Sequence, residues 1–180
     1  VQVLFLAIGL LLTGHAILTP LLMVLIMITG DFLGMSLTTD HVRPSPQPNA
    51  WRVGNLTIAG VTMGLGELIF CTSILAFGAY RLGLAIGALQ TLSFLVIVFG
   101  NQATTYTNRE RRHLWSSRPS VWLLVSSVAD ILIASTLAIG GIAMAPLPAW
   151  VVACTLAAAA AFAILLDLVK VPVFRRLGIA

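Results

Sequence analysis

Long runs of apolar residues with almost no charge divide this chain, and they constrain its fold more than any other feature. A helix needs about 20 mostly apolar residues to cross a bilayer, and five runs come near that length: 20–37, 56–79, 83–106, 121–143 and 150–169. A shorter run over 1–12 predicts a further helix. Charged residues form 9% of the chain, whereas they form about a quarter of a soluble domain. The sequence therefore predicts an all-α membrane protein, with one transmembrane domain of six helices over residues 1–180.

The positions of the basic residues predict the topology of these helices. If the helices alternate in direction, Arg81 falls on one side of the membrane. The other nine of the ten Lys and Arg residues fall on the opposite side: Arg43, Arg52, Arg109, Arg111, Arg112, Arg118, Lys170, Arg175 and Arg176. Basic loops concentrate on the cytoplasmic side. We therefore expect three hairpins in a plasma or inner membrane, with both ends of the chain in the cytoplasm.

The same placement accounts for the net charge of +4 without a nucleic acid partner. The cluster from Arg109 to Arg118 sets the topology in this interpretation, and contact with anionic lipid headgroups is the alternative. The lipid bilayer is the partner that the composition predicts.

One carboxylate stands out because it falls inside an apolar run. Asp31 lies between Gly30 and Gly34 in the run over 20–37. An acid in hydrocarbon costs about 2.5–3.5 kcal/mol on insertion scales, and it indicates a functional site. Because hydrocarbon disfavours the charged form of a carboxyl group, Asp31 could also carry a proton.

The glycines around Asp31 suggest how an ion would be held. They permit local unwinding, which would free backbone carbonyls beside the carboxylate, and discontinuous membrane helices coordinate small cations in this way. We expect the helix to be interrupted near Gly30–Asp31, with Asp31, Thr29 and Gly30 binding the ion. A purely structural acid is the alternative.

Four further polar residues within the runs are candidates for an ion or proton relay: Glu67, Asn101, Gln102 and Asp130. Glu67 and Asp130 lie near the middle of their helices, where they are either relay groups or packing acids in a protonated or hydrogen-bonded form. The amides of Asn101 and Gln102 could hydrogen-bond across helices. Asp167 has a simpler explanation, because Lys170 three residues later predicts an ion pair at a helix end.

Other chemistries find no support in the residue pattern. Cys71 and Cys154 lie in apolar runs without CxxC or Cys/His spacing, so we expect free thiols rather than metal ligands or a disulfide. His15 predicts an exposed loop residue. No phosphate-binding glycine loop, nucleophile elbow or zinc spacing occurs. The sequence thus predicts no metal site and no ability of this chain alone to bind or split ATP.

Glycines four residues apart predict places where helices approach closely, since the missing Cβ lets backbones come together in lipid. The pairs are Gly30/Gly34, Gly60/Gly64 and Gly83/Gly87.

The polar segment after the second apolar run carries a recognisable motif. Its form is (S/T)-x-D-x-V-x-P-S-P-x-P-x-x-W, matched here by Thr38 or Thr39, Asp40, Val42, Pro44, Ser45, Pro46, Pro48 and Trp51. This segment, with the acid upstream, resembles the sixth membrane helix and following cytoplasmic loop of P-type ATPases, most closely the plasma-membrane proton pumps and their bacterial relatives. The six helices would correspond to the fifth to tenth helices of that family.

The resemblance implies roles for particular residues. Asp31 matches the proton-binding acid of the family by position. The loop residues Asp40, Arg43, Pro44, Pro46 and Trp51 would help couple the second helix to the cytoplasmic domains. Gly30 stands where plant and fungal pumps have Asn, and Gln2 where they have Arg, so a cation other than the proton is the alternative.

Large parts of such a pump have no counterpart in this sequence: the phosphorylated aspartate motif, the nucleotide domain, the dephosphorylating loop and the first four helices. ATP and Mg would bind that N-terminal portion, which is thus an expected partner. There is no signal peptide. Because the chain opens inside an apolar run without Met, we expect a fragment, a split-gene product or part of a longer chain.

Two functions follow. The first is the membrane part of an ion-motive ATPase that exports protons or another cation. The second is a non-catalytic membrane scaffold or regulatory subunit derived from a truncated pump. The lack of an internal repeat argues against a stand-alone carrier.

Overall fold

The computed structural model describes residues 1–40, 53–109 and 113–176. These residues form six helices and contain no strand: α1 (Gln2–Thr13), α2 (Pro20–Leu37), α3 (Val53–Tyr80), α4 (Ile86–Asn108), α5 (Val121–Gly140) and α6 (Ala149–Arg176). The all-α, six-helix architecture that the sequence predicts is confirmed.

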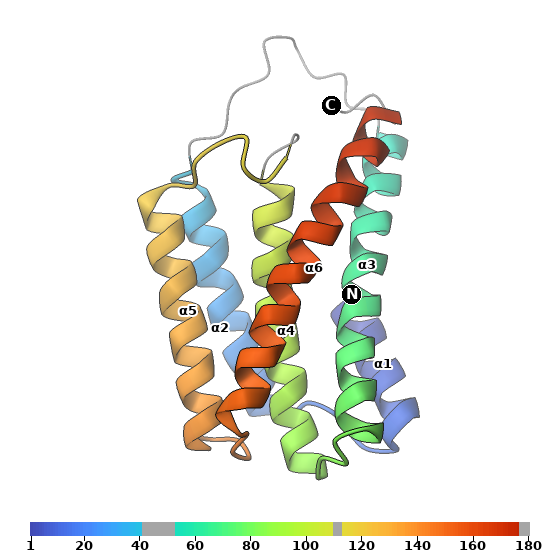
Figure 1. The fold of residues 1–180 in the computed structure, drawn as a ribbon, viewed down its shortest axis with the longest axis vertical. Helices are drawn as coiled ribbons and strands as arrows, with labels where there is room; N and C mark the ends of the chain where they lie inside the picture. The colour runs from blue at the N-terminus through green and yellow to red at the C-terminus, as the bar shows by residue number, and fades with distance from the viewer. Residues whose placement is uncertain (41–52, 110–112, 177–180) are drawn as a thin grey trace.

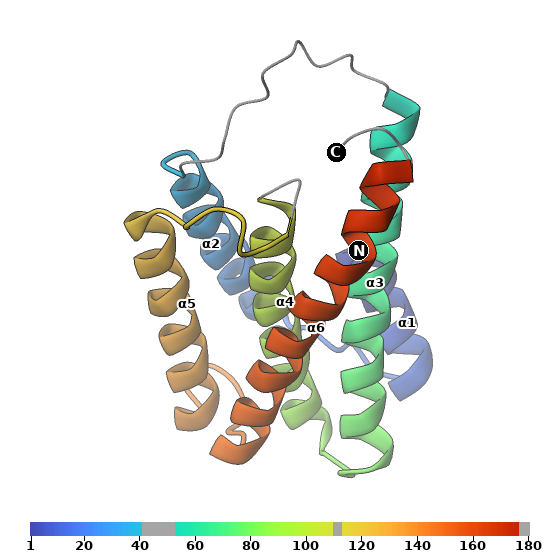
Figure 2. The same ribbon diagram turned by 45° about the horizontal axis from the view of Figure 1, so that its top comes forward.

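The central element of the bundle is α4 (Figure 1). It packs against α2, α3, α5 and α6, and the views in Figures 1 and 2 place it between α2 and α5 on one side and α3 on the other. Its middle turns, from Leu92 to Phe99, are buried on every side. A helix that is apolar and buried all round belongs to the interior of a bundle, so α4 forms the core on which the other helices assemble.

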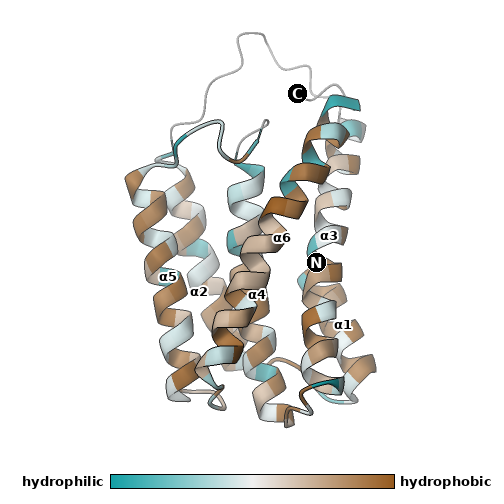
Figure 3. Ribbon diagram, viewed as in Figure 1, coloured by the Kyte–Doolittle hydropathy of each residue, from teal (hydrophilic) through white to brown (hydrophobic). Residues whose placement is uncertain are grey.

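The outer helices turn apolar side chains outward. Leu11, Val3 and Val121 are 86%, 79% and 72% exposed, and Figure 3 shows hydrophobic colour along the lengths of the helices with hydrophilic colour gathered near one end of the bundle. Five helices, α2 to α6, are long and apolar enough to cross a membrane, whereas α1 is shorter. An apolar exterior of this length suits lipid rather than water, which indicates an integral membrane protein.

Local sequence explains where several helices begin and end. The Thr19 hydroxyl accepts a hydrogen bond from Leu22 N–H at 3.3 Å, and Pro20 follows as the first helical residue of α2. Ser120 caps α5 in the same way. At the other end of α5, Gly141 adopts φ 65° and closes the helix. Small polar residues before a helix and glycine after it satisfy the backbone groups that the helix ends leave unpaired.

The first predicted hairpin does not pack as one. Within the described residues, α1 packs against α3, whereas α2 packs against α5 and α4. The segment between α1 and α2 is held at the end of α4, where the Gln90 side-chain amide donates to the carbonyl of Ala16 at 2.8 Å. The prediction of three packed hairpins therefore holds for α3–α4 and α5–α6 and is wrong for α1–α2.

The last helix is longer than predicted. α6 continues past residue 169, through Pro172, to Arg176. Proline removes one backbone donor, but Arg175 and Arg176 in the last turn suit the negative end of the helix dipole. Lys170 is thereby held inside the bundle instead of lying in a basic tail.

Close helix contacts involve glycines other than the predicted pairs. A Cβ added at Gly30, Gly34, Gly60 or Gly83 would have no heavy atom within 4 Å, apart from atoms of its chain neighbours and of the nearby backbone of its own helix. A Cβ at Gly78 of α3 would lie 2.5 Å from Leu92 Cδ2 of α4. Only the second members of two pairs make contact, Gly64 with Val1 and Gly87 with Ala145. Spacing alone thus did not identify the positions where a helix leaves no room for a methyl group.

We predict that Gly78→Ala lowers the free energy of unfolding by about 1–3 kcal/mol, because the methyl group has to displace a buried leucine. Leu92 is 1% exposed and has little space to move. Gly60→Ala is the matched control and should leave stability unchanged or raise it by up to about 1 kcal/mol. Unfolding in mixed detergent micelles measures both, and equal stability of the two variants would contradict the expected close contact.

Candidate functional site

Asp31 lies on the outer surface of the bundle. It belongs to the second half of α2, and its side chain is exposed on a face shared with Ile28, Phe32 and Met35, which are 46%, 64% and 69% exposed. A lone carboxyl group therefore interrupts an apolar surface of a helix that is long enough to cross the membrane.

The expected interruption of this helix is wrong. α2 is a continuous α-helix from Pro20 to Leu37. The Thr29 hydroxyl donates to the carbonyl of Ile26 in its own helix at 3.1 Å, and no heavy atom lies within 4 Å of the place where Gly30 would carry a Cβ. Glycine permits unwinding but does not cause it, and backbone groups in hydrocarbon are most easily satisfied inside a helix. The Gly30 carbonyl is thus not freed by unwinding, and the Thr29 hydroxyl donates its proton within its own helix.

One carboxyl group is a small part of a cation site. Ca²⁺ and Mg²⁺ take six or more oxygen ligands, and the described residues contain no group of three or more His, Cys, Asp and Glu side chains that could hold a metal ion. A cation at Asp31 would need ligands from elements packed against the exposed face of α2. A proton would need no further ligand.

The four relay candidates do not form one cluster. Gln102 of α4 and Asp130 of α5 are paired, with the amide nitrogen Nε2 donating to Oδ2 at 2.6 Å, and both side chains are buried. Glu67 of α3 lies elsewhere, beside Gly100 of α4. Asn101 is half-buried and forms no side-chain hydrogen bond to the other three in the described part of the chain. The structure therefore brings together one pair of the four residues.

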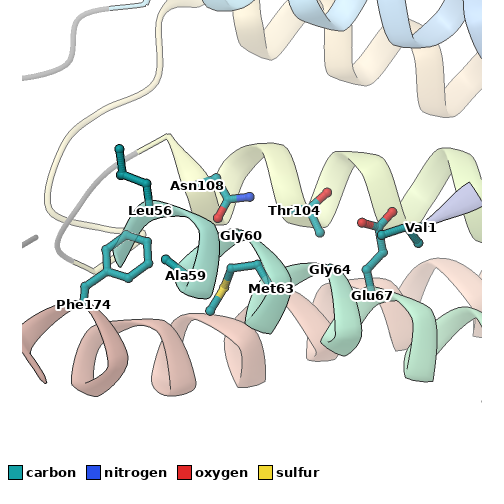
Figure 4. Close-up of a pocket in the computed structure, with 10 residues that line it drawn as sticks. All are labelled: Val1, Leu56, Ala59, Gly60, Met63, Gly64, Glu67, Thr104, Asn108 and Phe174. Carbon is teal, nitrogen blue, oxygen red and sulfur yellow. The ribbon is translucent and has the colours of Figure 1, made fainter. Parts of the chain in front are cut away.

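Glu67 borders a cavity of about 410 Å³ (Figure 4). Its wall includes Thr104 and Asn108 of α4 and Phe174 of α6, and one face of α3 supplies the small residues Gly60 and Gly64. The Glu67 carboxylate lies at the Val1 end of this space. Glu67 and the Gln102–Asp130 pair thus belong to separate polar regions of the bundle.

Asp40 has a structural partner that the sequence did not reveal. Its Oδ2 lies 3.0 Å from Arg109 Nη1, and both side chains are 1% exposed. Its Oδ1 accepts a hydrogen bond from Ser120 N–H at 2.8 Å. Asp40 thereby joins the end of α2 to the end of α4 and the start of α5. The other predicted coupling residues, Arg43, Pro44, Pro46 and Trp51, lie outside the described residues.

The sequence places Arg109 in a basic cluster that extends to Arg118 and either sets the topology or contacts lipid headgroups. In the structure Arg109 has a different role. It is buried in an ion pair and also donates to the carbonyl of Ser117, so it is not available to lipid headgroups. The sequence spacing indicates this position. Gln102, Tyr106 and Arg109 are four and three residues apart, which places them on one helix face.

The ion pair of Asp167 and Lys170 is confirmed, at 2.8 Å, and it is fully buried. Lys170 Nζ also donates to the carbonyl of Thr107 at 2.7 Å. Asp167 accepts from Leu114 N–H at 3.1 Å, and its Oδ2 lies 2.9 Å from His113 Nδ1. The cluster fastens α6 to the end of α4 and to the segment before α5. His113 was missed because the sequence places it in a polar loop 54 residues away.

The chain is similar to a protein of Methanocaldococcus jannaschii named "putative cation-transporting ATPase". The two are 28% identical over 144 residues, which is 79% of this chain and 18% of that protein. The chain resembles part of a cation-transporting ATPase. No family model matches it. The similarity covers most of this chain, and it agrees with the resemblance to an ATPase that the motif after α2 indicates. The chain spans under a fifth of the relative's length.

We predict that breaking the Asp40–Arg109 pair destabilises the bundle. Arg109→Met and Asp40→Ala should each lower the free energy of unfolding by about 3–5 kcal/mol, because each leaves a buried charge without its partner. The double variant should lose much less than the sum of the two. Unfolding in mixed micelles measures all three.

Arg118→Met is the matched control for this experiment. Arg118 is exposed, so its replacement should change stability by less than about 0.5 kcal/mol. Additive losses in the double variant would show that Asp40 and Arg109 do not act as a pair.

Proposed function

We propose that this chain forms the C-terminal part of the membrane domain of a P-type ATPase that exports a cation, with the proton as the transported ion. Three observations support the proposal: the similarity to a cation-transporting ATPase, the five apolar helices of membrane-spanning length, and the family motif around Asp40. The proton is favoured because Asp31 is a single exposed carboxyl group, and the described residues contain no group of three or more His, Cys, Asp and Glu side chains that could hold a metal ion.

The observation that carries the proposal is the exposed carboxyl group of Asp31 on a continuous, lipid-length helix. A carboxylate that faces hydrocarbon costs about 2.5–3.5 kcal/mol on insertion scales. The cost disappears if another membrane segment covers this face of α2. In a P-type ATPase the first four membrane helices are available for this purpose, so Asp31 would bind its ion between α2 and that part of the pump.

The other parts of the pump would lie beyond one end of this bundle. α2, α4 and α6 end, and α3 and α5 begin, at the upper end in Figure 1. Most of the basic residues belong to this end in sequence, and the positive-inside rule supports a cytoplasmic side for it. ATP and Mg would bind the cytoplasmic domains, and the segment that begins with Asp40 would transmit their movements to α2.

The experiment is ion transport by the complete native protein in sealed membrane vesicles. We expect ATP-driven acidification of the vesicle interior, followed with a pH-sensitive dye, and we expect Asp31→Asn to abolish it because asparagine cannot take up and release a proton. Protein abundance and unfolding temperature should stay unchanged, since the side chain makes no contact that stabilises the bundle.

Thr136→Val is the control, because Thr136 is a polar residue on the exposed surface of α5 whose hydroxyl bonds only to its own helix, at the carbonyl of Ile133. Its transport should equal that of the unmodified protein. Undiminished acidification by Asp31→Asn would refute the ion-binding role. No ATP-driven transport by the unmodified protein would instead favour the scaffold or regulatory subunit.

A further inference from the structure

The contact between α4 and α5 contains a row of polar pairs that the proposed function does not use. One face of α4 supplies Gln102, Tyr106 and Arg109, and the facing side of α5 and its cap supply Asp130, Ser127 and Ser120. Gln102 pairs with Asp130 at 2.6 Å and Tyr106 with Ser127 at 2.9 Å, while Asp40 joins Arg109 to Ser120. The row runs from the interior of the bundle to the end at which α5 begins.

The innermost pair has an incomplete set of hydrogen bonds. Gln102 and Asp130 are 6% and 7% exposed. Gln102 Nε2 donates to Asp130 Oδ2, but Asp130 Oδ1 and Gln102 Oε1 are both buried without a hydrogen-bond partner. Both atoms are acceptors when Asp130 is ionised. Two buried acceptors without a donor, in the same pair of side chains, are unfavourable and require an explanation.

One proton supplies the missing donor. A carboxylic acid has one O–H donor as well as an acceptor, and a primary amide has both kinds of group. If Asp130 carries a proton on Oδ1, that oxygen becomes a donor and Gln102 Oε1 is the acceptor that lacks one. The existing bond from Nε2 to Oδ2 is kept. Protonation therefore turns the two orphan acceptors into one donor and one acceptor within the same pair of side chains.

The surrounding charges also favour the neutral form of Asp130, since no described Lys, Arg or His forms an ion pair with it. The titratable groups on the helices packed against α5 are otherwise engaged or distant. Asp31 is on the exposed face of α2, and the buried charges of α4 and α6 are paired with other residues: Arg109 with Asp40, and Asp167 with Lys170.

A route for the proton leads along the same interface. The Tyr106 hydroxyl donates to Ser127 Oγ about one turn from Asp130, towards Ser120. Ser127 is buried and Tyr106 is half-buried. A hydroxyl group both donates and accepts, so it can receive one proton and pass on another.

We propose that Asp130 and Gln102 form a proton-binding pair inside the bundle, connected through Tyr106 and Ser127 to the end at which α5 begins. Uptake adds one proton to the carboxylate of Asp130, release returns it to water, and no electron is transferred. The pair is separate from Asp31 and does not depend on the ion-binding role proposed for that residue.

Infrared spectroscopy of the full chain in lipid vesicles tests this proposal. At neutral pH the unmodified protein should show the C=O stretching band of a protonated carboxyl group. Asp130→Asn should remove that band, and its unfolding temperature should be unchanged, because the Asn amide donates to Gln102 Oε1 in place of the acid. Gln102→Leu should shift the band to higher frequency through the loss of both hydrogen bonds. The comparison is made in a chain that also carries Asp31→Asn and Glu67→Gln, because each of these two membrane carboxyl groups gives a band of its own if it is protonated. This double-variant background should keep the Asp130 band.

Deuterium exchange tests the route. The band should shift when the vesicles are transferred to D₂O, and Tyr106→Phe combined with Ser127→Ala should slow that shift several-fold. The absence of the band from the Asp31→Asn, Glu67→Gln background, or a band that persists when Asp130→Asn is added to it, would overturn the proton-binding pair. If Asp130→Asn fails to fold, the response to Gln102→Leu decides, and an unshifted band overturns the proposal. An unchanged exchange rate overturns the route.

Discussion

The constraint on which this structure depends is that a polar group in hydrocarbon has to find its partner inside the protein. The interhelical polar contacts of the bundle meet this constraint at the central helix, α4. Gln102, Thr107 and Arg109 of α4 bond to α5, to α6 and to the segment after α2, respectively. Apolar packing holds the middle of α4, while polar bonds hold its last two turns and, through Gln90 and Thr91, its beginning. The polar contacts of α4 therefore lie towards its two ends.

Asp31 differs from the other membrane acids because it lies on the outer surface of the bundle, where the described residues give it no partner. Asp130 and Asp167 have donors from neighbouring helices, and Glu67 borders a cavity. Asp31 faces away from all of them on a surface of exposed apolar side chains. The bundle thus leaves one costly carboxyl group at its boundary, which is the property expected of a surface that another membrane segment covers.

Much of the fold follows from the sequence, because long apolar runs leave few alternatives to helices. The bounds of α2 were predicted correctly, and so was the ion pair of Asp167 with Lys170, because both depend on local spacing. The interruption at Gly30 was not, since glycine lowers the cost of unwinding without requiring it. The partners of Asp40 and His113 depend on how distant segments meet: Asp40 reaches a residue 69 positions away. Local sequence patterns do not show which distant segments meet, although the shared helix face of Gln102, Tyr106 and Arg109 gave a partial indication of these contacts.

The separation of α1 from α2 has a consequence for the biogenesis of the protein. These helices follow one another along the chain, yet they end on opposite sides of α4, and the short connection between them is fastened to α4 at Gln90. They cannot reach their final neighbours as a preformed unit, because α3 and α5 are made after them. Insertion into the membrane must therefore leave α1 and α2 loosely associated, and assembly must wait until α4 is in place between them.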